Sequence, residues 1–144
     1  HACGSGGTAA GVALGAARYE VAPLVMPFAV CDDAAYFEAT IDRIVAECRG
    51  RAPALPAPVT VRVQDFAKGP AYGVMSDEQK QFLVTAARRS GLLFDPVYTG
   101  KALFGLQRAV QEGWVRRGAR VLFFHTGGLP GLLAQGPDLE AALP

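Results

Sequence analysis

The sequence has almost no excess charge, few cysteines and no long hydrophobic run. Fourteen basic residues against 13 acidic ones leave a net charge of +1 over 144 residues. This balance gives no electrostatic footprint for a nucleic acid or an anionic membrane surface. The apolar stretch 21–30 is too short to span a bilayer and contains two prolines, and no secretory signal is visible. We therefore expect neither a nucleic-acid nor a membrane partner.

The three cysteines form no recognisable site. Cys3, Cys31 and Cys48 contain neither a CxxC pair nor a Cys/His spacing typical of zinc. An odd number of thiols favours the reduced state over a disulfide framework. We predict a cytoplasmic setting, no metal, and three cysteines that act as small apolar fillers.

The remaining composition is that of a globular domain. Hydrophobic residues make up 51% of the chain and charged residues 19%, which is enough apolar side chain for one domain with its own core. A glycine-rich turn begins at Gly4, and such a turn normally follows a strand. The three residues before it do not provide that strand, so we expect the strand to be absent and the sequence to be incomplete at its N-terminus.

Helical and extended patterns alternate along the chain. Helices are predicted at 8–19, 34–47, 76–89, 99–112 and 129–134, and strands at 20–30, 59–66, 92–94 and 120–124. This alternation predicts an α/β fold, with a three-layer, mostly parallel open sheet and helices on both faces. Pro27 should bend its strand or place it near an edge. The segment 50–58 is a proline-rich linker, and the last ten residues form a polar tail.

Three helix ends carry specific signals. Asp32 and Asp33 precede the second helix as caps. Ser76 and Gln79 have the spacing of a capping box, and Gly91 provides a glycine stop at the end of that helix. In the following helix, the larger apolar residues are expected to face the core. These are Leu103, Leu106 and Val110.

The glycine-rich turn is a candidate phosphate site. It consists of Gly4, Ser5, Gly6, Gly7 and Thr8, directly before a predicted helix. Backbone N–H groups at a helix N-terminus bind phosphate well where glycines leave them uncovered, and the two hydroxyls add donors. No Gly-Lys-Ser/Thr follows, which excludes a nucleoside-triphosphate loop. A tight turn without a ligand remains an alternative.

A second alternative is a dinucleotide site. Gly4, Gly6 and Ala9 fit a loose form of the dinucleotide fingerprint, and Asp32 would then be placed to bind a ribose. The capping role explains the same aspartate equally well.

Two further polar turns follow predicted strands. Residues 95–101 read Asp-Pro-Val-Tyr-Thr-Gly-Lys, and residues 125–128 read His-Thr-Gly-Gly. In a parallel sheet both would open on the same rim as the glycine-rich turn, which suits a flat phosphorylated cofactor. Tyr98 and Thr99 place two hydroxyls at this rim.

Three other side chains near these turns have open roles. Tyr72 lies in a glycine-flanked loop and either reaches into a cleft or anchors the loop. His125 is either catalytic or a hydrogen-bonded residue at a strand end. Lys101 opposes the helix dipole in a first turn, so we expect it to pair with an acid such as Asp95.

Together these motifs resemble one family, the D-cysteine desulfhydrase / 1-aminocyclopropane-1-carboxylate deaminase group. These are pyridoxal-phosphate enzymes of the tryptophan-synthase-β type. The similarity extends from Cys3 to about Ala134 and rests on the order and spacing of residues 4–11, 72–73, 95–101 and 125–132. It implies that the run from Gly4 to Thr8 holds the phosphate of pyridoxal 5'-phosphate.

The same resemblance implies roles for three side chains. Thr99 corresponds to the partner of the pyridine nitrogen, and Tyr98 and Tyr72 to active-site tyrosines near the substrate and the ring. Deaminases of the group have Glu where Thr99 stands, whereas desulfhydrases have Thr. A neutral hydroxyl makes the ring a weaker electron sink, which suffices for expelling a thiolate but suits the opening of a cyclopropane poorly.

The implied reaction is the β-elimination of D-cysteine to pyruvate, ammonia and hydrogen sulfide. A 1-aminocyclopropane-1-carboxylate deaminase or an L-cysteate sulfo-lyase relative is the alternative. A non-catalytic phosphate-binding remnant and a dinucleotide-binding half-domain are further alternatives.

The family's Schiff-base lysine lies in an N-terminal half that this sequence does not contain. Lys68, Lys80 and Lys101 do not stand in the context of that lysine. The resemblance therefore implies a C-terminal portion, inactive alone, whose partners are the N-terminal portion and a small amino-acid substrate. It also implies a homodimer for the full-length enzyme.

Overall fold

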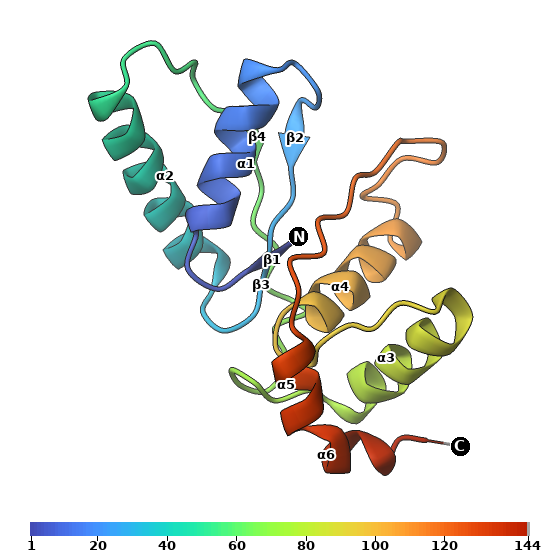
Figure 1. Cartoon of the computed structure of the whole chain (residues 1–144). Coiled ribbons are helices and arrows are strands. Elements are labelled where there is room, and N and C mark those ends of the chain that lie inside the picture. Colours follow the sequence, from blue (N-terminus) through green and yellow to red (C-terminus); the bar gives the residue numbers. More distant parts are fainter. Residues whose placement is uncertain (144) are drawn as a thin grey trace.

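The computed structural model describes residues 1–143 as helices that alternate with short parallel strands (Figure 1). The elements are β1 (Ala2–Cys3), α1 (Gly7–Arg18), β2 (Leu24–Val25), β3 (Phe28–Ala29), α2 (Ala34–Arg51), β4 (Thr60–Val61), α3 (Asp77–Ser90), α4 (Thr99–Gln111), α5 (Leu129–Ala134) and α6 (Gly136–Glu140). The predicted α/β class is thus confirmed. Within the described range, no helix combines the length and the apolar character needed to cross a membrane.

The strands form two parallel pairs. β1 pairs with β3, and β2 pairs with β4. The strand predicted at 20–30 is interrupted at Pro27, which separates β2 from β3 because proline has no N–H to donate. The strand that we expect to be absent before the glycine-rich turn is present as β1, so this prediction is wrong.

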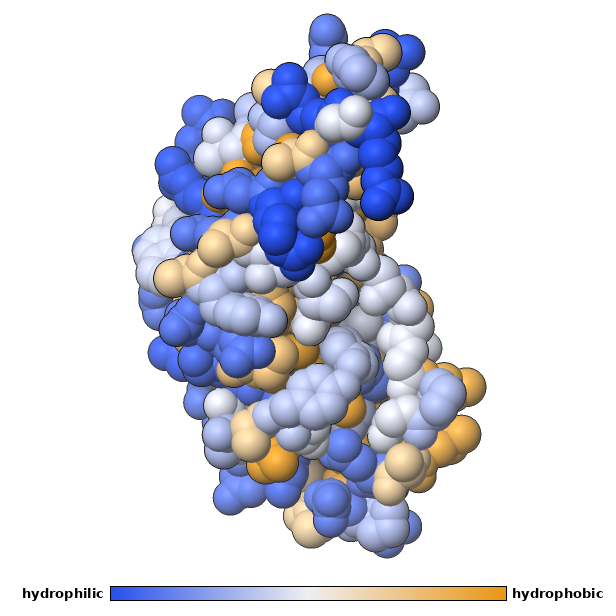
Figure 2. Space-filling view, turned by 90° about the vertical axis from the view of Figure 1, so that its left-hand side faces the viewer, coloured by the Kyte–Doolittle hydropathy of each residue, from blue (hydrophilic) through white to orange (hydrophobic). Residues whose placement is uncertain are grey.

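Helices α1 and α2 pack against each other beside the strands (Figure 1). Ala9 and Ala10 of α1 are almost fully buried, and they share one core cluster with Phe37 and Ile41 of α2. Alanines on α1 let the two helices approach closely, so the bulky side chains of α2 fill the space between them. The opposite face of α2 carries charged residues, and Figure 2 shows a mostly hydrophilic surface over this helix.

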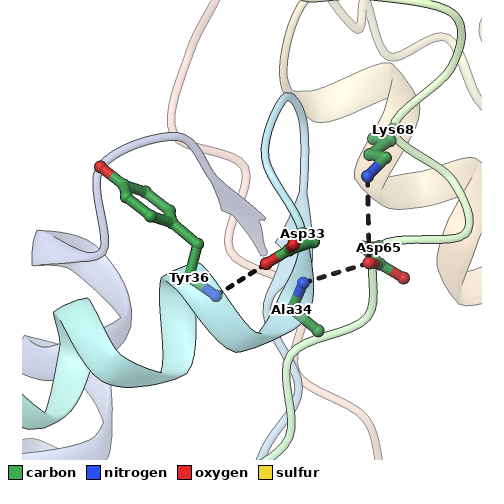
Figure 3. A network of polar contacts seen from close by, with 5 residues as sticks. All are labelled: Asp33, Ala34, Tyr36, Asp65 and Lys68. Carbon is green, nitrogen blue, oxygen red and sulfur yellow. Dashed lines mark hydrogen bonds and ion pairs between the residues drawn. The ribbon is translucent and has the colours of Figure 1, made fainter.

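Two aspartates hold the start of α2 (Figure 3). The Asp33 carboxylate accepts a hydrogen bond from the Tyr36 N–H at 2.8 Å, and Asp65 accepts one from the Ala34 N–H at 3.1 Å. Asp65 also pairs with Lys68 at 3.9 Å. The capping role predicted at this position is confirmed for Asp33.

All three cysteines are free. Cys3 is buried in the α1–α2 core cluster, and Cys31 and Cys48 pack against it. Burial raises the pKa of the Cys3 thiol to about 11. The thiols are apolar fillers, as predicted.

The capping box at Ser76 and Gln79 is present, and Gly91 ends α3 with a left-handed φ of 72°. The buried face predicted for α4 is correct in part: Leu103 and Leu106 are half-buried and pack against core clusters, but Val110 is 51% exposed. The face that is buried contains mostly small residues: Thr99, Gly100, Lys101, Ala102, Phe104, Gly105 and Ala109. Gly105 lies so close to the Phe28 ring that an added Cβ would overlap it. Close backbone approach, rather than side-chain size, selects this face.

The strands predicted at 92–94 and 120–124 are not formed. Leu92, Leu93, Val121 and Leu122 are exposed, and no strand among residues 1–143 pairs with either segment. Side chains link the two segments instead, because the Phe94 and Phe123 rings meet edge to face with their centroids 6.4 Å apart. The predicted polar tail is also wrong in part, because it contains α6.

Candidate functional site

The turn before α4 is organised around one buried carboxylate. Asp95 is 2% exposed. Its Oδ2 accepts hydrogen bonds from the N–H groups of Val97 (2.9 Å) and Tyr98 (2.8 Å), and its Oδ1 accepts one from the Thr99 N–H (2.7 Å). A carboxylate at a helix N-terminus is favoured both by these free donors and by the helix dipole. Asp95 therefore fixes the direction in which α4 begins.

The Thr99 hydroxyl belongs to the same network. Its Oγ1 donates to Asp95 Oδ1 at 2.6 Å and accepts from the Asp95 N–H at 3.0 Å, and the residue is fully buried. The hydroxyl proton is thus engaged by the Asp95 carboxylate.

Tyr98 and Tyr72 come together although 26 residues separate them in the sequence. Their hydroxyls form a hydrogen bond, and their rings meet edge to face with centroids 5.9 Å apart. Tyr98 is 36% exposed and Tyr72 is 56% exposed, so both phenols can be reached from outside. The hydrogen bond to Tyr72 is the largest cause that raises the pKa of Tyr98 to about 12. Tyr98 therefore keeps its proton at neutral pH.

The glycine-rich turn lies beside Tyr98. A Cβ added at Gly4 would come within 3.0 Å of the Tyr98 ring. Gly6 caps α1 with a left-handed φ of 81°, and no side chain caps the helix. The first turn of α1 contains no acidic residue, and Ser5 and Thr8 are exposed. The N–H groups at this end of α1 are thus open to an anion.

The turn at 125–128 packs on the other side of Asp95. Gly128 has a φ of 121°, and a Cβ added there would overlap the Asp95 side chain. His125 accepts from the Gly127 N–H at Nδ1 (3.2 Å), so its Nε2 donates to the Leu93 carbonyl (2.8 Å). Both ring nitrogens are therefore occupied by backbone groups, and the structure favours the hydrogen-bonded alternative for His125.

Lys101 does not pair with Asp95, so this prediction is wrong. Its side chain is fully buried, and its Nζ donates to the carbonyls of Lys68 (2.6 Å), Ala71 (2.8 Å) and Val30 (3.4 Å). Burial lowers the pKa of Lys101. The lysine reaches these carbonyls because it lies on the buried face of α4, whereas Asp95 is occupied at the helix start.

The structure thus brings the three polar turns together, as the sequence predicted. Sequence reasoning missed the central position of Asp95 and the carbonyl contacts of Lys101. A signal for Asp95 was available, because an aspartate followed by proline at the start of a helix is typical of a side-chain cap. No local signal identifies the acceptors of Lys101, which lie 30 to 71 residues away in the sequence.

Comparison with known proteins assigns the chain to a class. Residues 1–127 match the family described as pyridoxal-phosphate dependent enzymes, and the chain belongs to that family.

Among curated relatives, the chain is 37% identical over 134 residues to the bifunctional D-cysteine desulfhydrase/1-aminocyclopropane-1-carboxylate deaminase of Arabidopsis thaliana, covering 91% of this chain and 32% of that protein. It is 34% identical over 148 residues to the D-cysteine desulfhydrase of Salmonella paratyphi C, covering 96% of this chain and 42% of that protein. It is also similar to a solved structure described as an ACC deaminase homologue, with a TM-score of 0.81 and 30% identity, over 99% of this chain and 42% of the other. The chain therefore spans about two fifths or less of the length of these relatives.

Replacing Asp95 with Ala should lower the free energy of unfolding by about 2–4 kcal/mol, because the helix loses its cap and buried donors lose their acceptor. Asp33→Ala removes an exposed cap of the same chemistry and should cost only about 1 kcal/mol. Urea denaturation of the three proteins measures the difference. Equal losses for the two variants would contradict the central position of Asp95.

Replacing Tyr72 with Phe should lower the pKa of Tyr98 from about 12 toward its ordinary value of 10, because the variant removes the largest cause of the shift. The folded-state pKa is raised, so the associated stability is present below pH 10 and is lost as the pH rises from 10 to 12. Absorbance titration of tyrosinate measures the shift. The control is Tyr19→Phe, which removes a 77% exposed tyrosine. Its titration should still contain the raised pKa of Tyr98. If the raised pKa of Tyr98 remains in Tyr72→Phe as well, the hydrogen bond is not its cause.

Proposed function

We propose that this chain provides the phosphate and ring-nitrogen side of a pyridoxal-phosphate-dependent lyase that eliminates the β-substituent of an amino acid. D-Cysteine is the preferred substrate of this proposal, giving pyruvate, ammonia and hydrogen sulfide. The observation that carries it is the contact of the open glycine-rich turn with Tyr98, whose hydroxyl in turn meets that of Tyr72. An anion site and a pair of accessible phenols lie side by side.

The residues at the start of α1 fit the phosphate of the cofactor. The first turn of α1 has neither a side-chain cap nor an acidic residue. The glycines leave its N–H groups uncovered, and a Cβ at Gly4 would fill the space next to Tyr98. Gly4, Ser5, Gly6, Gly7 and Thr8 would hold the phosphate. When bound, pyridoxal phosphate supplies an electron sink for the substrate carbanion.

We propose that the tyrosine pair acts on the substrate. The hydrogen bond from Tyr72 raises the pKa of Tyr98, so Tyr98 is protonated near neutral pH and can donate a proton toward a leaving group, with the Tyr72 hydroxyl beside it. Tyr98 and Tyr72 are the catalytic residues that we propose.

Thr99 is proposed as the partner of the ring nitrogen. Its hydroxyl proton is directed at Asp95 Oδ1, so this role requires the hydroxyl to turn away from that carboxylate. A threonine supplies no negative charge to hold the nitrogen protonated. This favours the expulsion of a thiolate over the opening of a cyclopropane, which is the reaction of the deaminase alternative.

We further propose that the Schiff-base lysine belongs to an N-terminal portion of the same enzyme, and that the full-length enzyme is a cytoplasmic homodimer. Support for the first part comes from the share of the relatives' length that the chain spans. Lys101 does not replace that lysine, because its amino group is buried among three carbonyls. The 144 residues alone should therefore be inactive.

The full-length protein that carries this chain should release pyruvate and sulfide from D-cysteine after loading with pyridoxal phosphate. Ammonia release from 1-aminocyclopropane-1-carboxylate should be far slower. Parallel assays with D-cysteine, 1-aminocyclopropane-1-carboxylate and L-cysteate measure the preference. Faster turnover of the cyclopropane substrate would replace the desulfhydrase with the deaminase, and turnover by the 144 residues alone would refute the two-portion arrangement.

Replacing Gly7 with Asp in the full-length protein should weaken pyridoxal phosphate binding about tenfold or more, because the new carboxylate repels the phosphate at short range. Gly7 has open space around it, with only Ser5 Oγ within 4 Å of an added Cβ, at 3.9 Å. The Gly7→Asn variant has nearly the same shape without the charge, and it should bind within a few-fold of wild type. Equilibrium dialysis measures both constants. Equal binding by the two variants would show that the phosphate lies elsewhere.

A further inference from the structure

Lys101 is a buried cation whose partners are carbonyl groups. Its Nζ has three hydrogen-bond acceptors, all of them backbone oxygens. Within residues 1–143, none of the ion pairs involves this lysine. Burying an ammonium without a carboxylate is costly unless its donors are satisfied. The three carbonyls accept the hydrogen bonds of the ammonium. The buried position of Lys101 therefore depends on a backbone arrangement that brings these carbonyls together.

These carbonyls lie where the two tyrosines meet. Ala71, which accepts at 2.8 Å, directly precedes Tyr72, and Lys68 accepts at 2.6 Å three residues earlier. Lys101 itself follows Tyr98 by three residues in the first turn of α4. One amino group therefore connects the loop that carries Tyr72 with the helix that follows Tyr98.

The loop closes around the lysine stem. Gly69 has a φ of 74°, and a Cβ added there would lie 3.5 Å from Lys101 Cε and 2.7 Å from the Val74 carbonyl oxygen. Little room is therefore left at this point of the loop. The third acceptor, the Val30 carbonyl, belongs to the residue after β3, whose N–H donates to Cys3 directly before the glycine-rich turn. The lysine thus also contacts the segment beside the proposed phosphate site.

Within the loop, the Val74 N–H also donates to the Ala71 carbonyl at 3.1 Å, and two other side chains hold the ends of the loop. Gln79 donates to the Ala67 carbonyl at 2.7 Å, and Gln135 donates to the Gly73 carbonyl at 3.1 Å. The ammonium of Lys68 points to Asp65, which binds the start of α2 (Figure 3). Between these anchors, Lys101 supplies the side-chain donor to the carbonyls at 68 and 71.

We propose that Lys101 is a positioning residue that holds the Tyr72 loop so that the Tyr72 hydroxyl meets that of Tyr98. It acts through the backbone of residues 68–71 and touches neither substrate nor cofactor. The effect of Lys101 on turnover rests on the proposed function of the two tyrosines. Its effect on the order of the Tyr72 loop is independent of that function.

The test uses the full-length protein with Lys101→Met, Tyr72→Phe and the double variant, and Lys80→Met as the control. Lys80 forms an ion pair on the surface of α3 with Asp77. Hydrogen exchange should become at least tenfold faster in residues 68–74 of Lys101→Met and stay unchanged in α3. Lys80→Met should leave residues 68–74 as in wild type. Unchanged exchange in that loop of Lys101→Met overturns the proposal.

Turnover gives the second measurement. Lys101→Met should lower kcat about tenfold with a smaller change in KM, and the double variant should be no slower than the slower single variant within about twofold. Fully additive losses would mean that Lys101 acts independently of Tyr72 and would overturn the positioning role. If Lys101→Met does not fold, Lys101→Gln, which keeps an N–H donor, is measured in the same way. An inactive wild type would refute the proposed function, while hydrogen exchange would still decide the effect of Lys101 on the loop.

Discussion

The arrangement of the site depends on the carboxylate of Asp95. Three backbone N–H groups and the Thr99 hydroxyl all donate to it, and it is almost completely buried. These bonds set where α4 begins, and hence where Tyr98 and Thr99 stand. Gly128 lies against the same carboxylate with no room for a side chain. The turn at 125–128 is therefore placed by the cap rather than by a strand.

The two organising side chains lie on either side of the start of α4: Asp95 precedes the helix and Lys101 belongs to its first turn. Asp95 gathers N–H donors at the start of α4, and Lys101 gathers carbonyl acceptors from the Tyr72 loop and from the end of β3. The two side chains have opposite charges but are not paired with each other. The negative carboxylate binds backbone N–H groups, and the positive ammonium binds backbone carbonyls. Tyr98 lies between the two residues in the sequence, and it is next to Gly4 in the structure. The proposed phosphate site and the tyrosine pair are thereby held on a common support.

Local signals in the sequence were sufficient to predict the helix ends and the glycine-rich turn. The Ser76 capping box, the Gly91 stop and the glycine-rich turn before α1 depend on residues within one helical turn, and each is found as predicted. Apolar runs were a weaker guide. Residues 92–94 and 120–124 have the composition of buried strands, but a strand also needs a neighbour to share its hydrogen bonds. Long-range partners such as those of Lys101, and the close approach of Gly105 to Phe28, are set by tertiary packing.

We propose above all that the open N-terminus of α1 binds the phosphate of pyridoxal 5'-phosphate beside the two tyrosines. A crystal structure of the full-length protein with the cofactor bound tests it most directly. We expect phosphate oxygens within hydrogen-bonding distance of the backbone N–H groups of Gly6, Gly7 and Thr8, with the ring next to Tyr98. A phosphate bound at another helix, or a ring remote from Tyr98, would contradict it.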